Sequence, residues 1–166
     1  MRSRTSEWFE TKIKYEKMTD DGTMKKVSEQ YVVDALSFTE AEKRVTEEMS
    51  SYISGEYEVA NIKKAAYGEI FFSDVDTDDK WYKAKLQFIT LDEKSGKEKR
   101  QNVNYLVQAK SLMGAVKAID EVMGGTMIDY EIAAVVETMI MDVYEYSVAK
   151  KEDTPDDKPE FQAESK

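Results

Sequence analysis

The side chains that could catalyse a reaction are limited, because the 166-residue chain contains neither cysteine nor histidine. Thiolate chemistry, zinc sites of the Cys/His type and hydroxyl nucleophiles activated by histidine are therefore excluded. The acidic run at residues 74–79 (DVDTDD) supplies the first three ligand positions of a calcium loop. However, Asp79 stands where that loop requires glycine, and Lys85 stands where it requires glutamate. We therefore predict no catalytic site, no metal and no cofactor, and expect a non-enzymatic binding module.

Two segments combine a tryptophan with basic and amide side chains at alternate positions, and they are the best candidates for a binding site. One segment begins at Trp8 and the other at Trp81. Aromatic rings stack on bases at about 1–3 kcal/mol per base, while cations follow the phosphates. This composition predicts binding of single-stranded DNA or RNA. The predicted contact residues are Trp8, Lys12, Lys14, Lys26, Trp81, Lys83, Lys85 and Arg100.

The two tryptophan segments belong to an internal repeat that extends over most of the chain. Residues 7–15 align with 80–88, and residues 31–37 align with 105–111. The offset is 73 residues from Trp8 to Trp81 and 74 residues from Tyr31 to Tyr105. Order, spacing and polarity all persist, which compositional bias alone would not produce. The sequence therefore predicts two copies of one structural unit.

Each copy is predicted to contain two strands, a helix and a further strand. Alternating polarity predicts the strands, and turn residues such as those at 19–22 separate them. Ser37 with Glu40 predicts a helix start of the capping-box type, and Gly55 ends that helix. In the first copy the predicted ranges are strands 8–18 and 25–36, a helix from 37 and strand 57–72, with a bend at Gly68. In the second copy they are strands 80–91 and 99–110, helix 112–123 and strand 129–146.

These elements predict an α+β fold made of two tandem ββαβ repeats related by a pseudo-twofold axis. We expect an antiparallel sheet with both helices on one face, since a single three-stranded unit has little core of its own. The predicted divisions are residues 1–73 for the first repeat, 74–79 for an acidic linker, 80–148 for the second repeat and 149–166 for a disordered acidic tail.

Strand alternation assigns one face of each hairpin to the core beneath a helix. The candidate nucleic-acid residues all fall on the opposite faces. The predicted core faces are Phe9, Thr11, Ile13, Tyr15, Val27, Tyr31, Val33 and Ala35 in the first copy, and Tyr82, Ala84, Leu86, Phe88, Val103, Tyr105, Val107 and Ala109 in the second.

The same surface residues also have a purely structural interpretation. A tryptophan at the start of a strand can cover the end of a core, and lysines that alternate with amides are typical of solvated strands. The alternative function is a protein–protein adaptor or a self-associating module, which pairs with a protein or with a second copy. The lack of cysteine, the lack of an apolar run long enough to span a bilayer and the polar N-terminus predict a cytoplasmic protein without a membrane partner. The net charge of −10 argues against a protein wrapped wholesale by nucleic acid, but it leaves room for a local basic face.

Three segments carry a resemblance to a known family: RTSEWF at 4–9, EQYVVDALSFTEAE at 29–42 and DKWYKAK at 79–85. They resemble a domain-of-unknown-function family of Bacteroidales gut bacteria and their phages. The similarity extends from residue 1 to about residue 148, so only the tail falls outside it. The resemblance implies a bacterial or phage origin and a cytoplasmic setting. It implies no activity that could be assigned to particular residues.

Overall fold

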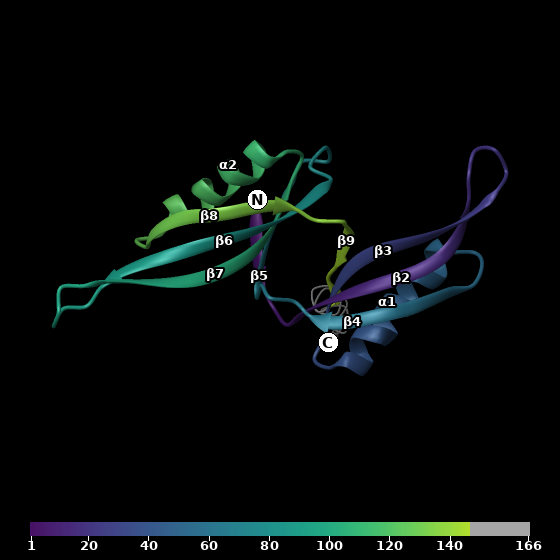
Figure 1. Cartoon of the computed structure of the whole chain (residues 1–166), viewed down its shortest axis with the longest axis horizontal. Coiled ribbons are helices and arrows are strands. Elements are labelled where there is room, and N and C mark those ends of the chain that lie inside the picture. Colours follow the sequence, from purple (N-terminus) through teal and green to yellow (C-terminus); the bar gives the residue numbers. More distant parts are fainter. Residues whose placement is uncertain (147–166) are drawn as a thin grey trace, which may run out of the picture. The chain divides into compact units, whose positions relative to one another are not determined.

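The computed structural model describes residues 1–146, which form two compact units (Figure 1). Of the described residues, unit 1 contains 1–6 and 65–141, and unit 2 contains 7–64 and 142–146. Within the described residues there are two helices and nine strands, so the predicted α+β class is confirmed. The predicted tail at 149–166 lies outside the described residues.

Unit 2 has a four-stranded sheet in the order β4-β2-β3-β9, with helix α1 packed against it. Its central hairpin turns at Gly22, whose φ of 87° lies in the left-handed region that favours glycine. Ser37 caps α1, because its hydroxyl accepts the Glu40 N–H at 3.1 Å, while the Glu40 carboxylate accepts the Leu36 N–H at 2.7 Å. The elements are β2 (Trp8–Met18), β3 (Met24–Asp34), α1 (Phe38–Tyr52), β4 (Tyr57–Lys64) and β9 (Ile140–Tyr144).

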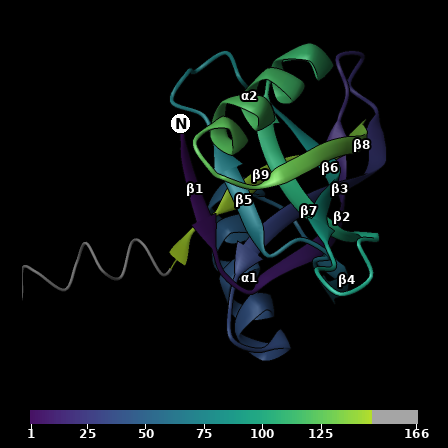
Figure 2. The same cartoon turned by 90° about the vertical axis from the view of Figure 1, so that its left-hand side faces the viewer.

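Unit 1 has a five-stranded sheet in the order β1-β5-β7-β6-β8, with helix α2 lying across it (Figure 2). Strands β5 and β7 are parallel, whereas the other neighbours in this sheet are antiparallel. Ser111 caps α2 through the Gly114 N–H, at the position that matches Ser37 in the repeat. The elements are β1 (Arg2–Thr5), β5 (Glu69–Phe72), β6 (Lys80–Leu91), β7 (Glu98–Ala109), α2 (Leu112–Gly124) and β8 (Asp129–Glu137).

The two copies of the repeat have the same order of elements and the same irregularity in their sheets. The β2–β4 ladder shifts register between Lys12 and Ile13, and the β6–β8 ladder shifts register between Lys85 and Leu86. These positions are 73 residues apart, which is the offset of the sequence repeat. A relation through a pseudo-twofold axis stays a prediction.

The last strand of each copy differs from the prediction, because each predicted strand is in fact two strands in two different sheets. The segment predicted as 57–72 becomes β4, in the sheet of unit 2, and β5, in the sheet of unit 1. The segment predicted as 129–146 becomes β8 in unit 1 and β9 in unit 2. The chain therefore forms two sheets, each with its own helix, rather than one antiparallel sheet with both helices on one face. The compact units accordingly do not follow the repeat ranges 1–73 and 80–148.

The predicted core faces are confirmed in both units. The core of unit 2 lies between α1 and the sheet and includes Phe9, Ile13 and Val33, while the core of unit 1 includes Leu86 and Val107. The polar Thr11 is also buried, and its hydroxyl donates to the Tyr31 carbonyl at 2.9 Å. Alternation of polarity was therefore sufficient to locate the helix-covered side of both hairpins.

Candidate functional site

The two tryptophans lie opposite the helices, as predicted, but neither is at the surface. Trp8 is 2% exposed and Trp81 is 3% exposed. The Trp81 ring meets the ring of Phe72 edge-on at 5.7 Å between centroids. A base cannot stack on an indole that is already buried, so these two residues do not form the predicted stacking surface.

The sequence contains a signal for this burial that the hairpin interpretation missed. Val32 and Leu106 fall on the supposedly polar faces, yet both are fully buried. Each lies within an uninterrupted apolar triplet, residues 31–33 (YVV) and 105–107 (YLV). Continuous apolar runs are typical of strands that are buried on both faces. The strand ends near the tryptophans are therefore buried on both faces. Only the halves of the hairpins near their turns have a solvent-exposed face.

The six predicted basic residues lie on the hairpin faces opposite the helices, three in each unit. Lys12 is half-buried, whereas Lys14, Lys26, Lys83, Lys85 and Arg100 are exposed. Arg100 forms a charge-assisted hydrogen bond with Glu131 and lies 3.6 Å from a carboxylate oxygen of Glu98. The Lys83 ammonium lies 5.9 Å from the centre of the Tyr67 ring. Two of these six cations thus interact with groups of the protein itself.

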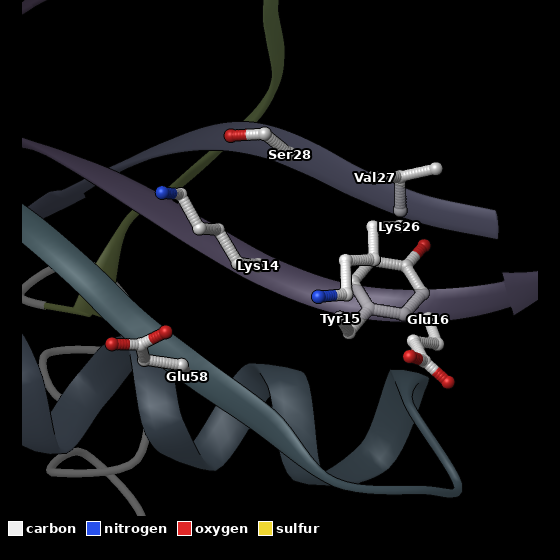
Figure 3. A pocket seen from close by; sticks show the side chains of 7 residues that line it. All are labelled: Lys14, Tyr15, Glu16, Lys26, Val27, Ser28 and Glu58. Carbon is white, nitrogen blue, oxygen red and sulfur yellow. The ribbon is translucent and has the colours of Figure 1, made fainter.

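Lys14 and Lys26 are brought together at a pocket of about 530 Å³ in unit 2 (Figure 3). Two lysines and two carboxylates contribute to its wall, so their formal charges cancel. A wall of this composition has no preference for a polyanion. The lining residues are Lys14, Tyr15, Glu16, Lys26, Val27, Ser28 and Glu58.

Tyrosines near this pocket are held in their protonated form. The Tyr15 and Tyr31 hydroxyls donate to the two oxygens of Glu29 at 3.0 and 2.8 Å. Burial, followed by these hydrogen bonds to Glu29, raises the pKa of both phenols above the ordinary range. Neither tyrosine can therefore act as a base near neutral pH.

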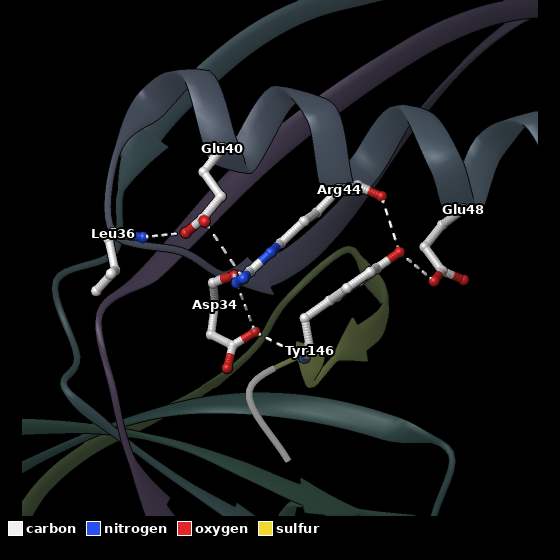
Figure 4. A network of polar contacts seen from close by, with 6 residues as sticks. All are labelled: Asp34, Leu36, Glu40, Arg44, Glu48 and Tyr146. Carbon is white, nitrogen blue, oxygen red and sulfur yellow. Dashed lines mark hydrogen bonds and ion pairs between the residues drawn. The ribbon is translucent and has the colours of Figure 1, made fainter. Parts of the chain in front are cut away.

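A buried polar network connects α1 to the end of the chain's described part (Figure 4). The Arg44 guanidinium donates to the Asp34 carbonyl and lies 3.5 Å from the Asp34 carboxylate. The backbone N–H of Tyr146 donates to the same carboxylate at 2.8 Å, and its hydroxyl bonds to Glu48 and to the Arg44 carbonyl. These groups bond to one another, so the network holds the segment after β9 against α1 and does not present a reactive group.

No metal site emerges in the part of the chain that the structure describes, since residues 1–146 contain no cluster of three or more Asp or Glu side chains arranged to hold an ion. In the acidic run that resembled a calcium loop, Asp74 instead binds the N-terminal ammonium at 2.7 Å. Asp78 accepts a hydrogen bond from the Ser73 hydroxyl.

The outer strand β8 is the feature of unit 1 that most resembles an interaction site. It lies at one edge of the five-stranded sheet, and its residues 132–136 (IAAVV) carry no charge. The side chain of Val136 is 60% exposed, and Ala133 and Ala134 are also exposed. An edge strand presents backbone donors and acceptors to which another strand can pair, and natural proteins usually guard such edges with charges.

The matching edge strand in unit 2 is guarded in that way. In β4, Asn61 and Lys63 occupy the positions that Ala134 and Val136 occupy in β8. Lys63 lies 3.6 Å from Glu10, and the next residue, Lys64, lies 3.0 Å from Glu7. The two copies thus contain a guarded and an unguarded version of the same edge, so the lack of charge at residues 132–136 is not a requirement of the fold.

The hydrogen-bond direction shows which backbone groups of β8 face outward. The Thr138 N–H donates to the Trp81 carbonyl at 2.9 Å, just beyond the facing pair Tyr82 and Glu137. In an antiparallel ladder this pattern marks a facing pair that does not exchange hydrogen bonds. The N–H and C=O of Glu137 therefore point away from β6, and alternation gives Val135 the same direction. These groups lie where an additional strand would pair.

The comparison with protein families gives one match. A family model described as Domain of unknown function (DUF4494) matches residues 7–146. The chain belongs to this family. The DUF4494 match covers β2 to β9, which includes both copies of the repeat and the β8 edge, and leaves β1 outside.

The expected membership of a domain-of-unknown-function family is confirmed by this match, and the occurrence of the family in Bacteroidales gut bacteria and their phages stays a prediction. No curated protein and no solved structure matches the chain. Neither helix in residues 1–146 combines the length and the apolar composition that crossing a membrane would require.

Proposed function

We propose that this DUF4494 protein is a binding module that receives an extended protein segment as an additional strand beside β8. The observation that carries the proposal is the unguarded edge at residues 132–136, compared with the lysine-guarded edge of β4. Strand addition obtains affinity from main-chain hydrogen bonds and specificity from alternate side chains. The outward-facing backbone groups of Val135 and Glu137 can form the main-chain hydrogen bonds, and the exposed Val136 provides a side chain that contributes to specificity.

Binding of single-stranded nucleic acid stays a prediction that ranks second. The exposed Lys14, Lys26 and Lys85 support it, while the buried indoles and the carboxylates beside the lysines weigh against it. Nucleic-acid binding would weaken steeply with added salt. The sequence resemblance supports a cytoplasmic role in Bacteroidales bacteria or their phages, and this setting belongs to the same proposal.

The proposal can be tested with linear peptides selected from a random displayed library for binding to the full chain. We expect the selected peptides to slow hydrogen exchange at the amides of Val135 and Glu137, because these N–H groups would enter a new ladder. The same peptides should lose binding to Val135→Pro, which removes one outward donor without removing a bond to β6.

The matched control is Ile62→Pro, which changes the aligned position of β4 and should leave peptide binding intact. Thermal unfolding of both variants shows whether each remains folded. If no peptide is enriched, or if the enriched peptides protect amides elsewhere and leave β8 exchanging freely, β8 is not a strand-receiving edge.

A further inference from the structure

The register shift in β8 changes which residues share a face. Ala133 is the extra residue, since Lys85 faces Ala134 while Leu86 faces Ile132. Tyr130, Ile132 and Val135 pack against the core beneath α2. Glu137 faces the core residue Tyr82 and therefore lies on the α2 side as well. By their facing partners on β6, the open face holds Asp129, Glu131, Ala134 and Val136.

We propose, resting on the proposed function, that the strand received by β8 is β8 of a second copy of this chain, in antiparallel orientation. A strand that pairs with itself about a twofold axis must place side chains of the same face opposite one another. Without the extra residue, β8 would do so only in registers with identical residues at the centre. Ala133 changes the alternation, so that an even-numbered residue before it and an odd-numbered residue after it lie on the same face. A register centred between two residues then also places side chains of the same face opposite one another.

One such register pairs the whole strand. It places Ile132 opposite the partner's Val135 and Tyr130 opposite the partner's Glu137, all on the α2 side of the sheet. On the open face it places Glu131 opposite the partner's Val136, and Asp129 falls opposite the partner's Thr138. The outward-facing backbone groups of Val135 and Glu137 then point at the second copy, as a ladder requires.

Charge favours this register over its alternatives. All three charged residues of β8 are acidic (Asp129, Glu131 and Glu137), so many self-pairings would place two carboxylates together. Pairings centred on Ala133 or on Ala134 would oppose Asp129 or Glu131 to the partner's Glu137. Like charges directly opposite one another destabilise a sheet. In the shifted register every carboxylate instead faces an uncharged residue.

The exposed Val136 makes the pairing testable by charge exchange. Val136→Glu places a second carboxylate opposite the partner's Glu131 on both sides of the twofold axis, and we expect it to raise the dimer dissociation constant about tenfold. Val136→Lys places an opposite charge there and should keep the dimer or strengthen it. The double variant Glu131→Lys with Val136→Glu restores opposite charges and should recover dimerisation.

The assay is light scattering after size exclusion on the full chain, over a series of concentrations and salt concentrations. We expect the mass to rise from 19.1 kDa towards twice that value with concentration. Because each copy carries a net charge of −10, added salt should strengthen the dimer by screening the repulsion. The matched control is Asn61→Glu, which adds the same charge to the aligned edge strand β4 and should leave the mass unchanged.

A mass of 19.1 kDa under every condition overturns the self-pairing. That outcome is distinct from failure of the proposed function, because peptide-induced protection of β8 would then identify the occupant as another protein. A dimer that Val136→Glu and Val136→Lys affect equally also overturns the register, as does a dimer that the double variant does not recover. Should Val136→Glu unfold the chain, Val136→Lys still decides the question, because loss of the dimer in that variant would overturn the register.

Discussion

The buried pair of Arg44 and Asp34 allows a quantitative prediction for the substitution Arg44→Met. The Asp34 side chain is fully buried, and that of Arg44 is 8% exposed. Methionine retains much of the length and apolar volume of the arginine stem but removes the cation. The change also removes the hydrogen bond to the Asp34 carbonyl at the end of β3.

The magnitude follows from what remains buried after the change. Removing one partner of a buried ion pair costs about 3–5 kcal/mol, because the other charge stays in a medium of low dielectric constant. For a chain of this size, each kcal/mol lowers the melting temperature by about 2–4 °C. We therefore expect Arg44→Met to lower the melting temperature by about 6–20 °C.

The assay is urea unfolding followed by tryptophan fluorescence, together with calorimetry. Glu40→Gln is the control, because it breaks the pair between Arg44 and Glu40, at 3.4 Å, whose carboxylate side is 31% exposed. Such a partly exposed pair contributes about 1 kcal/mol or less. If Arg44→Met and Glu40→Gln destabilise equally, the reasoning from burial is refuted.

Three further outcomes are expected. The two tryptophans should resist acrylamide quenching in the folded chain and become accessible only on unfolding, and an early quench would contradict their burial. Gly96→Ala should cost about 1 kcal/mol in urea unfolding, because its φ of 69° is strained for a residue with a Cβ, whereas Gly55→Ala should be nearly neutral. Hydrogen bonds from Thr19 and then Thr23 lower the pKa of Asp21 to about 2, so its stabilising contribution is present above the usual value of 3.8 and is lost as pH falls through about 2. A carboxyl titration by NMR checks this, and a midpoint near 3.8 would contradict it.

Local patterns in the sequence predicted the local structure well. The positions of both hairpins, the Ser37 cap and both helix-covered faces followed from alternation and from turn chemistry. These features depend on residues close together in the chain, such as Ser37 and Glu40. The sequence could not show that residues 57–72 divide between two sheets, because β-propensity does not identify the strand with which a segment pairs.

The candidate site was predictable only in part. Type and spacing placed Lys14, Lys26 and Lys85 on open faces, but exposure of the tryptophans depends on long-range packing near Val32 and Leu106. The difference in charge between β4 and β8 could have been found from the sequence, since the alignment of the two copies places Val136 at the position of Lys63. That this difference concerns an exposed edge could be recognised only from the strand order, because a missing lysine matters only in a strand at the edge of a sheet.

Strand β5 belongs to the sheet of the second copy and β9 to the sheet of the first copy, and this arrangement determines how the protein behaves after cleavage of its backbone. Cleavage of a peptide bond between residues 74 and 79 would yield two fragments, and each fragment would contribute strands to both sheets. The nicked protein should therefore migrate as one particle in native conditions and separate into two only in denaturant.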